Sequence, residues 1–279
     1  MVDASRLISQ LLTDGTQRIE AVSDSPLLDC QLLICHIIGK GREWLYSHAD
    51  ETLAESQAET YATLLARRER GEPLAYITGS RHFWRRDFRV TPATLIPRPA
   101  TELLVETILA RRGKAALQVL DLGTGSGAIA ISLAAERPAW SVTAVDRSAA
   151  ALVVAAGNAV DLKNIRFCQG HWCDGLAPDR FDIIVSNPPY VANADPHLKA
   201  LTFEPQDALK AGMDGLDCVR EIVQPGYDCL RRNGLLMIEH GYDQQAEVAQ
   251  LFADAGFSSI ECLTDLGSVP RAVLGLKHP

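Results

Sequence analysis

The alternation of apolar and polar residues divides the chain into two regions with different periodicity. Over residues 1–79, apolar positions recur at helical spacing and no strand pattern interrupts them. Ser25 and Pro26 suit the cap and first turn of a helix over 27–38, because proline has no N–H to lose at that position. A longer helix is predicted over 53–70. These features indicate a small helical bundle, too small and featureless to be the catalytic part.

The second region follows a connector, residues 80–99, in which two short runs predict a β-hairpin or linker. From residue 100 to residue 279, apolar runs typical of buried strands alternate with helical patterns. The predicted strands span 117–122, 141–145, 165–168, 181–186 and 234–239, with helices over 126–136 and 149–160. Two strand-like runs at the end, 258–263 and 271–276, have no helix between them. The pattern predicts an α/β fold with a Rossmann-like, mostly parallel sheet and a closing antiparallel hairpin.

Composition narrows the class of protein and its compartment. The chain has 279 residues, of which 47% are hydrophobic, enough for a sizeable core in one or two domains. It has no run of about 18 apolar residues and no signal-peptide pattern, so no membrane span or secretion is expected. Seven cysteines without a C-x-x-C pair favour reduced thiols in a cytoplasm and no metal site. The net charge of −8 argues against binding nucleic acid mainly through phosphates.

The first strand of the α/β region ends in a glycine-rich loop that suits a bound ligand. Glycines allow a sharp turn and a close approach of the ligand to the backbone. The spacing is G-x-G-x-G and differs from the dinucleotide fingerprint. A carboxylate just before such a loop would not help to bind phosphate, but it would favour a ligand with a cationic centre. The candidate cofactor residues here are Asp121, Gly123, Thr124, Gly125, Ser126 and Gly127.

Asp146 ends the second strand, about 20 residues beyond the glycines, where an acid pairs with ribose hydroxyls. An adenosine ligand with a positive charge, an amino acid tail and no phosphate is S-adenosylmethionine. We therefore predict this cofactor, with S-adenosylhomocysteine as the product. The glycine loop would hold its methionine part and Asp146 its ribose. Trp172 follows the third strand, at the adenine end of such a cleft, and either lies against the base or is a buried core residue.

The run Asn187-Pro188-Pro189-Tyr190 follows the fourth strand and carries the candidate chemistry. Each proline fixes its own backbone and favours extended geometry in the residue before it, so the carbonyl groups of Asn187 and Pro188 are held rigidly. The Asn187 side chain adds an acceptor oxygen and an NH2 donor. In isolation, a Pro-Pro turn after a strand explains this run. With the glycine loop and Asp146 on neighbouring strands, the pattern favours a binding site for a planar group that carries NH2.

We assign the catalytic roles to Asn187, Pro188 and Tyr190. An amide nitrogen is a poor nucleophile, because its lone pair is shared with the carbonyl group. The Asn187 side-chain oxygen and the Pro188 carbonyl would accept the two N–H bonds of a substrate amide and aim its lone pair at the methyl group. Tyr190 would pack on the amide plane. No general base is needed, because the proton can leave to water afterwards.

On these motifs the chain resembles the HemK/PrmC family, which methylates the glutamine of the Gly-Gly-Gln loop in class 1 peptide chain release factors. The resemblance covers nearly the whole chain and includes residues 95–99, 121–127, 187–190 and 203–209. It implies a class I S-adenosylmethionine-dependent methyltransferase in which Gly123 to Gly127, Asp146, Trp172 and Asn187 line the cofactor site. It also implies that Asn187, Pro188, Pro189 and Tyr190 hold the glutamine amide. Ala100 stands where the family usually has an acid, which leaves the contacts of the linker open.

Three alternatives share parts of this pattern. A DNA or RNA amino-methyltransferase acts on the same planar NH2 at adenine N6 or cytosine N4, although the charge of −8 argues against it. A ribosomal-protein glutamine methyltransferase shares the motif. A non-catalytic binder of adenosine ligands would need no amide clamp. We expect a cytoplasmic monomer with release factors as its protein partner and no direct contact with nucleic acid. Because one glutamine side chain offers few contacts, residues 1–79 are predicted to dock the folded substrate.

Other polar residues receive lesser roles. His240, at a strand end, is predicted to be a hydrogen-bonded structural residue rather than a catalytic one. Glu204 is expected near the mouth of the cleft, with an undefined role. Four arginines of the connector form either a solvated surface or a contact surface for an acidic or RNA-bound partner: Arg81, Arg85, Arg86 and Arg89.

Overall fold

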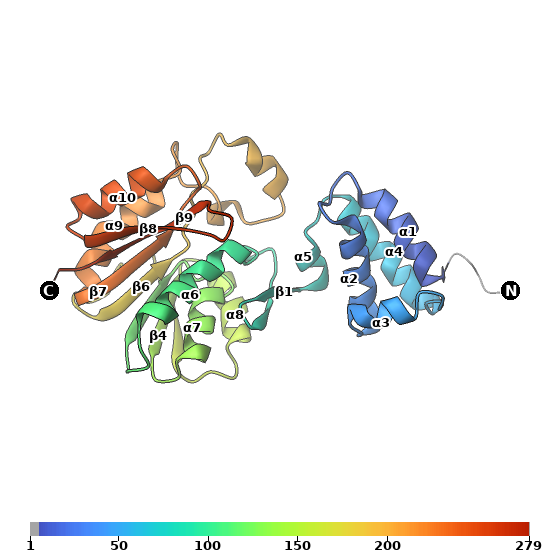
Figure 1. The fold of residues 1–279 in the computed structure, drawn as a ribbon, viewed down its shortest axis with the longest axis horizontal. Helices are drawn as coiled ribbons and strands as arrows, with labels where there is room; N and C mark the ends of the chain where they lie inside the picture. Colours follow the sequence, from blue (N-terminus) through green and yellow to red (C-terminus); the bar gives the residue numbers. More distant parts are fainter. Residues whose placement is uncertain (1–5, 279) are drawn as a thin grey trace. The chain divides into compact units, whose positions relative to one another are not determined.

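The computed structural model describes residues 6–278, which form two units with their boundary in the chain between Ser80 and Arg81 (Figure 1). Each unit has its own hydrophobic core, and the cores share no residue. None of the helices that the structure describes has the length and apolar character needed to span a bilayer.

The N-terminal unit is a bundle of short helices around the buried side chains of Ile8, Leu33 and Ile34. Two of the predicted helices are present, and α2 has the predicted bounds, because Gly39 adopts a left-handed conformation (φ 65°) that ends it. Helix α4 is shorter than predicted at both ends. The helices are α1 (Ile8–Ile19), α2 (Pro26–Ile38), α3 (Arg42–Ser47), α4 (Glu55–Glu69) and α5 (Leu74–Thr78).

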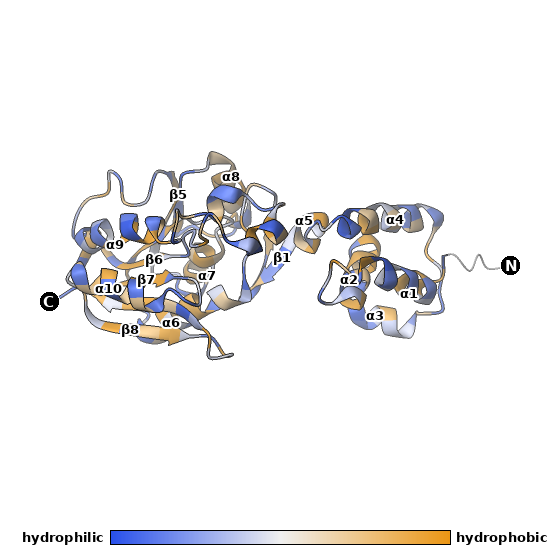
Figure 2. Cartoon of the chain, turned by 90° about the horizontal axis from the view of Figure 1, so that it is seen from above, coloured by the Kyte–Doolittle hydropathy of each residue, from blue (hydrophilic) through white to orange (hydrophobic). Residues whose placement is uncertain are grey.

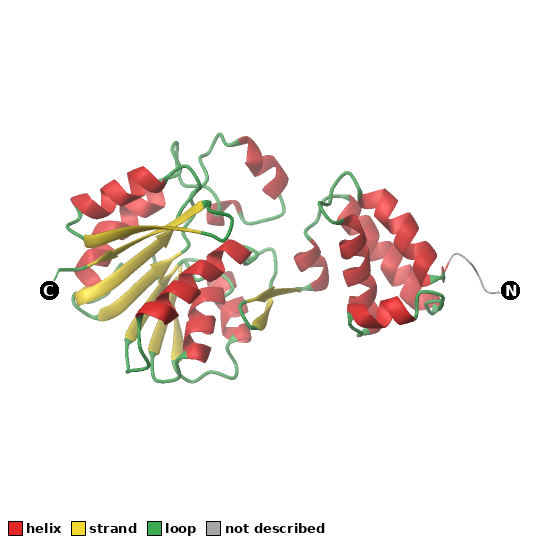
Figure 3. Ribbon diagram, viewed as in Figure 1, coloured by secondary structure: helices red, strands yellow, loops and turns green. Residues whose placement is uncertain are grey.

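The C-terminal unit opens with the predicted hairpin, β1 (Ser80–Phe83) and β2 (Arg86–Arg89), and continues as a seven-stranded sheet. The strand order is β5-β4-β3-β6-β7-β9-β8, and β9 is antiparallel to both of its neighbours. This confirms the predicted mostly parallel α/β sheet with a closing antiparallel hairpin (Figure 3). The strands are β3 (Gln118–Leu122), β4 (Ser141–Asp146), β5 (Ile165–Gln169), β6 (Phe181–Ser186), β7 (Leu230–Glu239), β8 (Ser258–Thr264) and β9 (Pro270–Leu276).

Helices cover both faces of this sheet. Helices α6 (Glu102–Arg111), α7 (Ala128–Glu136) and α8 (Ala149–Asn158) lie on one face, and α9 (Asp217–Cys229) and α10 (Gln245–Asp254) lie on the other (Figure 1). Helices α9 and α10 carry both polar and apolar residues (Figure 2), and their apolar side chains are buried against the sheet. Neither of these two helices was among the predicted ones. Three short 3-10 helices complete the unit: η2 (Pro99–Thr101), η3 (Pro196–Leu201) and η4 (Gln206–Ala208).

The register of the parallel strands sets the position of the candidate site. Leu122 at the end of β3 pairs with Val145 of β4 and with Ser186 of β6. Ser186 in turn pairs with Ile238 of β7. The residues that follow these four positions therefore meet at one edge of the sheet. The chain leaves β3 toward β4 on one side and reaches β6 on the other, so this edge is a topological switch point, where α/β proteins bind ligands.

Candidate active site

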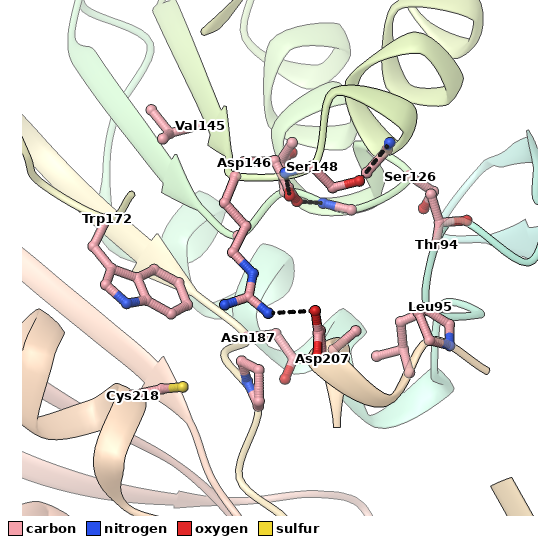
Figure 4. Close-up of a pocket in the computed structure, with 18 of the residues that line it drawn as sticks. Thr94, Leu95, Ser126, Val145, Asp146, Ser148, Trp172, Asn187, Asp207 and Cys218 are labelled. Atoms are coloured by element: carbon pink, nitrogen blue, oxygen red, sulfur yellow. Dashed lines mark hydrogen bonds and ion pairs between the residues drawn. The ribbon is translucent and has the colours of Figure 1, made fainter. Parts of the chain in front are cut away.

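A cavity of about 580 Å³ opens at the carboxyl ends of β3, β4 and β6 (Figure 4). Its volume lies in the range of sites for small molecules and cofactors. Eight of the predicted site residues line it: Gly123, Thr124, Gly125, Ser126, Asp146, Trp172, Asn187 and Pro189. Four predicted site residues do not: Asp121, Gly127, Pro188 and Tyr190. The cavity is bounded on its remaining sides by the linker around residues 93–98 and by the segment 205–212.

The glycine loop presents its backbone to this cavity. Gly123 and Gly125 have left-handed backbone angles (φ 71° and 57°), which other residues adopt only with strain. A Cβ at Gly125 would meet no atom within 4 Å and would therefore project into open space. A Cβ at Gly123 would lie 3.1 Å from the indole of Trp172. The absence of side chains at these two positions leaves room for a ligand against the loop.

Asp121 and Gly127 support the loop from outside the cavity. Asp121 is buried, and its Oδ2 atom accepts hydrogen bonds from the Thr124 hydroxyl (2.6 Å) and the Ala130 N–H (3.2 Å). Burial raises the pKa of Asp121 to about 7. Gly127 caps α7, and a Cβ there would lie 2.6 Å from Ile131. Asp121 therefore does not line the cavity, and its Oδ1 atom is buried without a partner among the described residues.

Asp146 connects the glycine loop to the next strand. Its Oδ2 atom accepts the Gly125 N–H and its Oδ1 atom accepts the Ser148 N–H, each at 2.8 Å (Figure 4). A carboxylate has about four acceptor sites, so two of them stay open for hydroxyl groups of a ligand on the cavity side. This geometry fits the predicted contact with a ribose.

Replacement of Asp146 by alanine is expected to weaken S-adenosylmethionine binding roughly tenfold or more, because each lost charged hydrogen bond costs about 1.5–3 kcal/mol. Calorimetric titration of the variant measures this effect. Asp182→Ala is a matched control, because Asp182 also accepts a backbone N–H, that of Gln118, but lies at the other end of the strands. Unchanged affinity of Asp146→Ala would mean that Asp146 only holds the loop.

Trp172 forms the wall of the cavity next to the glycine loop. Its indole N–H donates to the Glu221 carboxylate on α9 at 2.7 Å, which fixes the ring. The ring also packs beside Gly123, as the close approach of a Cβ there shows. Trp172 is half-buried and lines the cavity, so its ring is available to a flat ligand group.

The Asn187 side chain also lines the cavity. Its Nδ2 atom donates to the hydroxyl of Thr101 in η2 at 3.0 Å. Its Oδ1 atom is buried and has no hydrogen-bond partner among residues 6–278. A buried acceptor without a partner is costly, and at a cavity wall it marks a place for a donor on a ligand.

Pro188 and Tyr190 lie behind this wall. Pro188 is buried, and the Tyr190 hydroxyl donates to the carboxylate of Glu239 at 3.4 Å. Glu239 ends β7 and is itself 1% exposed. Thr101 and Glu239 were not among the predicted site residues. The available signal was the acidic residue that ends an apolar strand beside the strand that leads to Asn187.

Glu204 and His240 also receive places in the structure. The Glu204 carboxylate is buried, accepts the Ile96 N–H at 3.1 Å and forms an ion pair with Arg98. It therefore fastens the linker that borders the cavity, a role that the sequence left undefined. His240 is fully buried, its Nδ1 lies 2.7 Å from the Gly241 carbonyl, and it does not line the cavity. His240 thus has the hydrogen bond that was predicted for it and stands outside the residues that line the cavity.

An ion pair between Arg147 and Asp207 crosses the rim of the cavity (Figure 4). Arg147 follows β4 and Asp207 lies in η4, and the two groups are 2.9 Å apart. Their side chains are 53% and 85% exposed, so the pair contributes little to stability. The contact can therefore break when a ligand enters.

A crystal structure of a methyltransferase from Pyrococcus furiosus has the same fold. The similarity covers 69% of this chain and 89% of that one, with a TM-score of 0.53 and 18% sequence identity. The strand order and the cavity at the switch point, with its glycine loop and acid, agree with this likeness. The fold, the match of residues 98–254 to the model of the methyltransferase small domain and the relatives described next define a class I S-adenosylmethionine-dependent methyltransferase.

Sequence similarity to curated relatives identifies the family of this chain. A release factor glutamine methyltransferase of Salmonella typhimurium is 44% identical over 261 residues, which cover 92% of this chain and 94% of the relative. One from Burkholderia pseudomallei is 47% identical over 266 residues, which cover 91% and 93%. Residues 10–79 match the model of the PrmC N-terminal domain, and residues 98–254 match that of the methyltransferase small domain. The chain belongs to the release factor glutamine methyltransferase family.

Proposed function

We propose that this protein transfers a methyl group from S-adenosylmethionine to the side-chain amide nitrogen of the Gly-Gly-Gln glutamine in class 1 peptide chain release factors. The observation that carries the proposal is the buried Oδ1 atom of Asn187, which has no partner among the described residues and belongs to a residue that lines the cavity. A primary amide brings two N–H donors and no charge, which suits such an acceptor. Family membership supports the same substrate.

The residues of the cavity divide into two groups with different tasks. The loop from Gly123 to Ser126, Asp146 and Trp172 would hold S-adenosylmethionine, which supplies a methyl group on a positively charged sulfur. The open space over Gly125 and the free acceptor sites of Asp146 fit this cofactor. Asn187 and Pro189, which also line the cavity, would hold the glutamine amide.

Hydrogen-bond acceptors at the Asn187 end of the cavity would act on the substrate amide. Asn187 Oδ1 would accept one N–H bond of the substrate amide, and the Pro188 carbonyl could accept the other only if the wall in front of buried Pro188 opens. These acceptors would hold the nitrogen in place and favour its pyramidal form. The amide then loses the resonance that makes its nitrogen a poor nucleophile. The same acceptors stabilise the positive charge that develops on nitrogen. The proton leaves to water after the transfer.

A parallel assay distinguishes this function from its rivals. Transfer of a radiolabelled methyl group is measured with release factor, ribosomal proteins and DNA as acceptors, with Asn187→Ala enzyme as the blank. We expect label only in release factor, on the Gly-Gly-Gln glutamine. We further propose that the enzyme acts as a cytoplasmic monomer without direct contact to nucleic acid. Label in ribosomal protein or DNA, with none in release factor, would overturn the assignment.

The connector arginines differ in how far they are free to contact a substrate protein. Arg86 forms an ion pair with Asp161 at 2.7 Å and its side chain is 29% exposed. Arg85 is 74% exposed and lies 3.2 Å from Glu136. The solvated and contact interpretations thus apply to Arg85 and to Arg89, whose side chains are both exposed.

Charge reversal at Arg85 and Arg86 is expected to raise KM for intact release factor modestly, and less so at high salt, because exposed charges are screened over roughly 8 Å at physiological ionic strength. Arg85→Glu alone is the cleaner variant, since Arg86→Glu also breaks the ion pair with Asp161. Arg166→Glu, on the exposed side of β5, is the control. A KM that stays unchanged at every salt concentration would exclude a contact at this surface.

A further inference from the structure

Glu239, Thr101 and Tyr190 form a buried polar cluster next to Asn187. The strand register places Glu239 of β7 beside Asn187, because the residues before them, Ile238 and Ser186, are paired. Glu239 is 1% exposed and Thr101 is 4% exposed. Tyr190 donates to Glu239 at 3.4 Å, and Asn187 donates to Thr101 at 3.0 Å. The mechanism described above uses neither Glu239 nor Thr101.

The chemistry of these groups fixes the direction of every hydrogen bond in the cluster. An ionised carboxylate only accepts, so the Tyr190 hydroxyl donates to Glu239 Oε1. The other oxygen, Oε2, is buried without a partner among the described residues, and the Thr101 side chain is the hydrogen-bonding group that acts most strongly to lower the pKa of Glu239. With its hydrogen used in this way, the Thr101 oxygen can only accept from Asn187. Asn187 must then present its NH2 group to the cluster. By elimination, its Oδ1 atom points away from the cluster, and it is buried without a partner among the described residues.

We propose that Glu239 is a positioning residue that, through Thr101, sets the polarity of the Asn187 amide, so that an acceptor rather than a donor faces the substrate nitrogen. This inference rests on the proposed function for its kinetic consequence, but not for the hydrogen-bond arrangement itself. A neutral group at position 239 can donate to Thr101. Thr101 can then donate to Asn187. The Asn187 amide would turn to accept this bond, so that its NH2 group, rather than its oxygen, faces the NH2 group of the substrate.

The surroundings of Glu239 bring its pKa into a pH range in which the enzyme can be assayed. Burial raises the pKa of Glu239 to about 7, while Thr101, Arg271 on β9, Tyr190 and Asn187 each act to lower it. The neighbouring His240 is held neutral, because burial lowers its pKa. Burial raises the pKa of Tyr190 as well, so this phenol stays protonated, and Arg98 and Arg271 carry the positive charges near it.

The sign of the pH effect follows. Above about pH 7, Glu239 is ionised and Asn187 has the productive polarity. Below that pH, a protonated Glu239 becomes a donor, and the productive fraction falls up to tenfold per pH unit. The wild-type enzyme is therefore expected to lose kcat as the pH drops from 8 to 6, and Glu239→Gln is expected to have a low kcat without this limb.

Four variants of the full-length enzyme test whether Glu239 acts on Asn187 through Thr101. Glu239→Gln and Thr101→Val are each expected to lower kcat about 10- to 100-fold, with cofactor affinity within threefold of wild type. Because both interrupt one chain of contacts, the double variant should lose no more than about threefold beyond the worse single variant. Thr101→Ser keeps the hydroxyl and should restore kcat to within threefold. Glu261→Gln, on the exposed strand β8, is the matched control.

Stability separates positioning from a purely structural role. Glu239→Gln removes a buried charge, so its melting temperature should equal or exceed that of wild type while kcat falls. A parallel fall in melting temperature and kcat, or a pH limb that persists in Glu239→Gln, would overturn the proposal.

A measurement without substrate tests the polarity directly. In protein labelled with 15N-asparagine, the side-chain NH2 signals of Asn187 are identified by their loss in Asn187→Ala. These signals should titrate near pH 7 in wild type and not in Glu239→Gln. If they titrate but release factor is not methylated, the proposed function fails and the polarity inference stands. If release factor is methylated but the signals do not respond to pH, or Glu239→Gln has normal kcat, the inference fails alone.

Discussion

Replacement of Asn187 by alanine is expected to lower the rate of methyl transfer at least 100-fold and to leave S-adenosylmethionine affinity within a few-fold of wild type. A 100-fold loss corresponds to about 2.7 kcal/mol of transition-state stabilisation. The variant removes the Oδ1 acceptor, which holds the substrate nitrogen, but leaves the glycine loop and Asp146 intact. The effect should therefore appear in the chemical step rather than in cofactor binding.

Single-turnover rates and calorimetry on the same preparation measure the two quantities. Asn164→Ala is the matched control, because the Asn164 amide donates to the Ala134 and Trp140 carbonyls away from the cavity. That control should lower stability without changing the rate of the folded enzyme. Near-normal turnover of Asn187→Ala would remove Asn187 from the mechanism.

The edge of the sheet that carries the site could be predicted from the sequence. Apolar runs that end at residues 122, 145 and 186 are each followed by a polar motif, and parallel strands bring their carboxyl ends to one edge. The same argument brings Gly125, Asp146 and Asn187 to one cavity. This part of the prediction depends only on strand periodicity and direction.

The side of the loop on which each residue lies could not be predicted in this way. Asp121 turns beneath the loop because Thr124 and the Ala130 N–H offer it hydrogen bonds there. Gly127 is needed because a Cβ would clash with Ile131, which is a packing requirement of α7. Both facts depend on the path of the backbone through the loop and the first turns of α7, which residue type and spacing alone do not give.

Other differences between the predicted and the observed structure also have specific physical causes. Helix α9 contains Pro225, which interrupts the helical pattern although the helix continues to Cys229. Helix α4 begins at Glu55 rather than at residue 53, because Thr52 pairs with Leu7 in an isolated bridge and keeps the chain extended. Thr101 joins the site from η2, far from Asn187 in the sequence, so no spacing rule connects them.

Selectivity for one glutamine among many requires contacts beyond the clamp, and the N-terminal unit is the candidate surface. A glutamine side chain in the cavity presents only its amide and two methylene groups, which are common to every glutamine. The N-terminal unit has a separate core, so its residues are not needed to build the cavity. It also exposes large apolar side chains, among them Leu27 (50%) and Tyr46 (68%). We propose that this unit docks the folded release factor.

Deletion of residues 1–79 is expected to raise KM for intact release factor at least tenfold, which corresponds to a loss of about 1.4 kcal/mol of binding energy. S-adenosylmethionine affinity should stay almost unchanged, because every residue that lines the cavity lies in the C-terminal unit. Steady-state kinetics with intact release factor, and calorimetry with the cofactor, measure the two effects.

A short peptide that contains Gly-Gly-Gln is the control substrate. It reaches the clamp but is too small to contact a separate unit, so full-length and truncated enzymes should methylate it with equal kcat/KM. This comparison also shows whether the truncated enzyme is folded and active. Leu27→Ala with Tyr46→Ala in the full-length chain should reproduce a smaller part of the KM increase, because each loses apolar contact area. If the truncated enzyme methylates the peptide normally and intact release factor with unaltered KM, specificity lies in the C-terminal unit and the docking proposal is wrong.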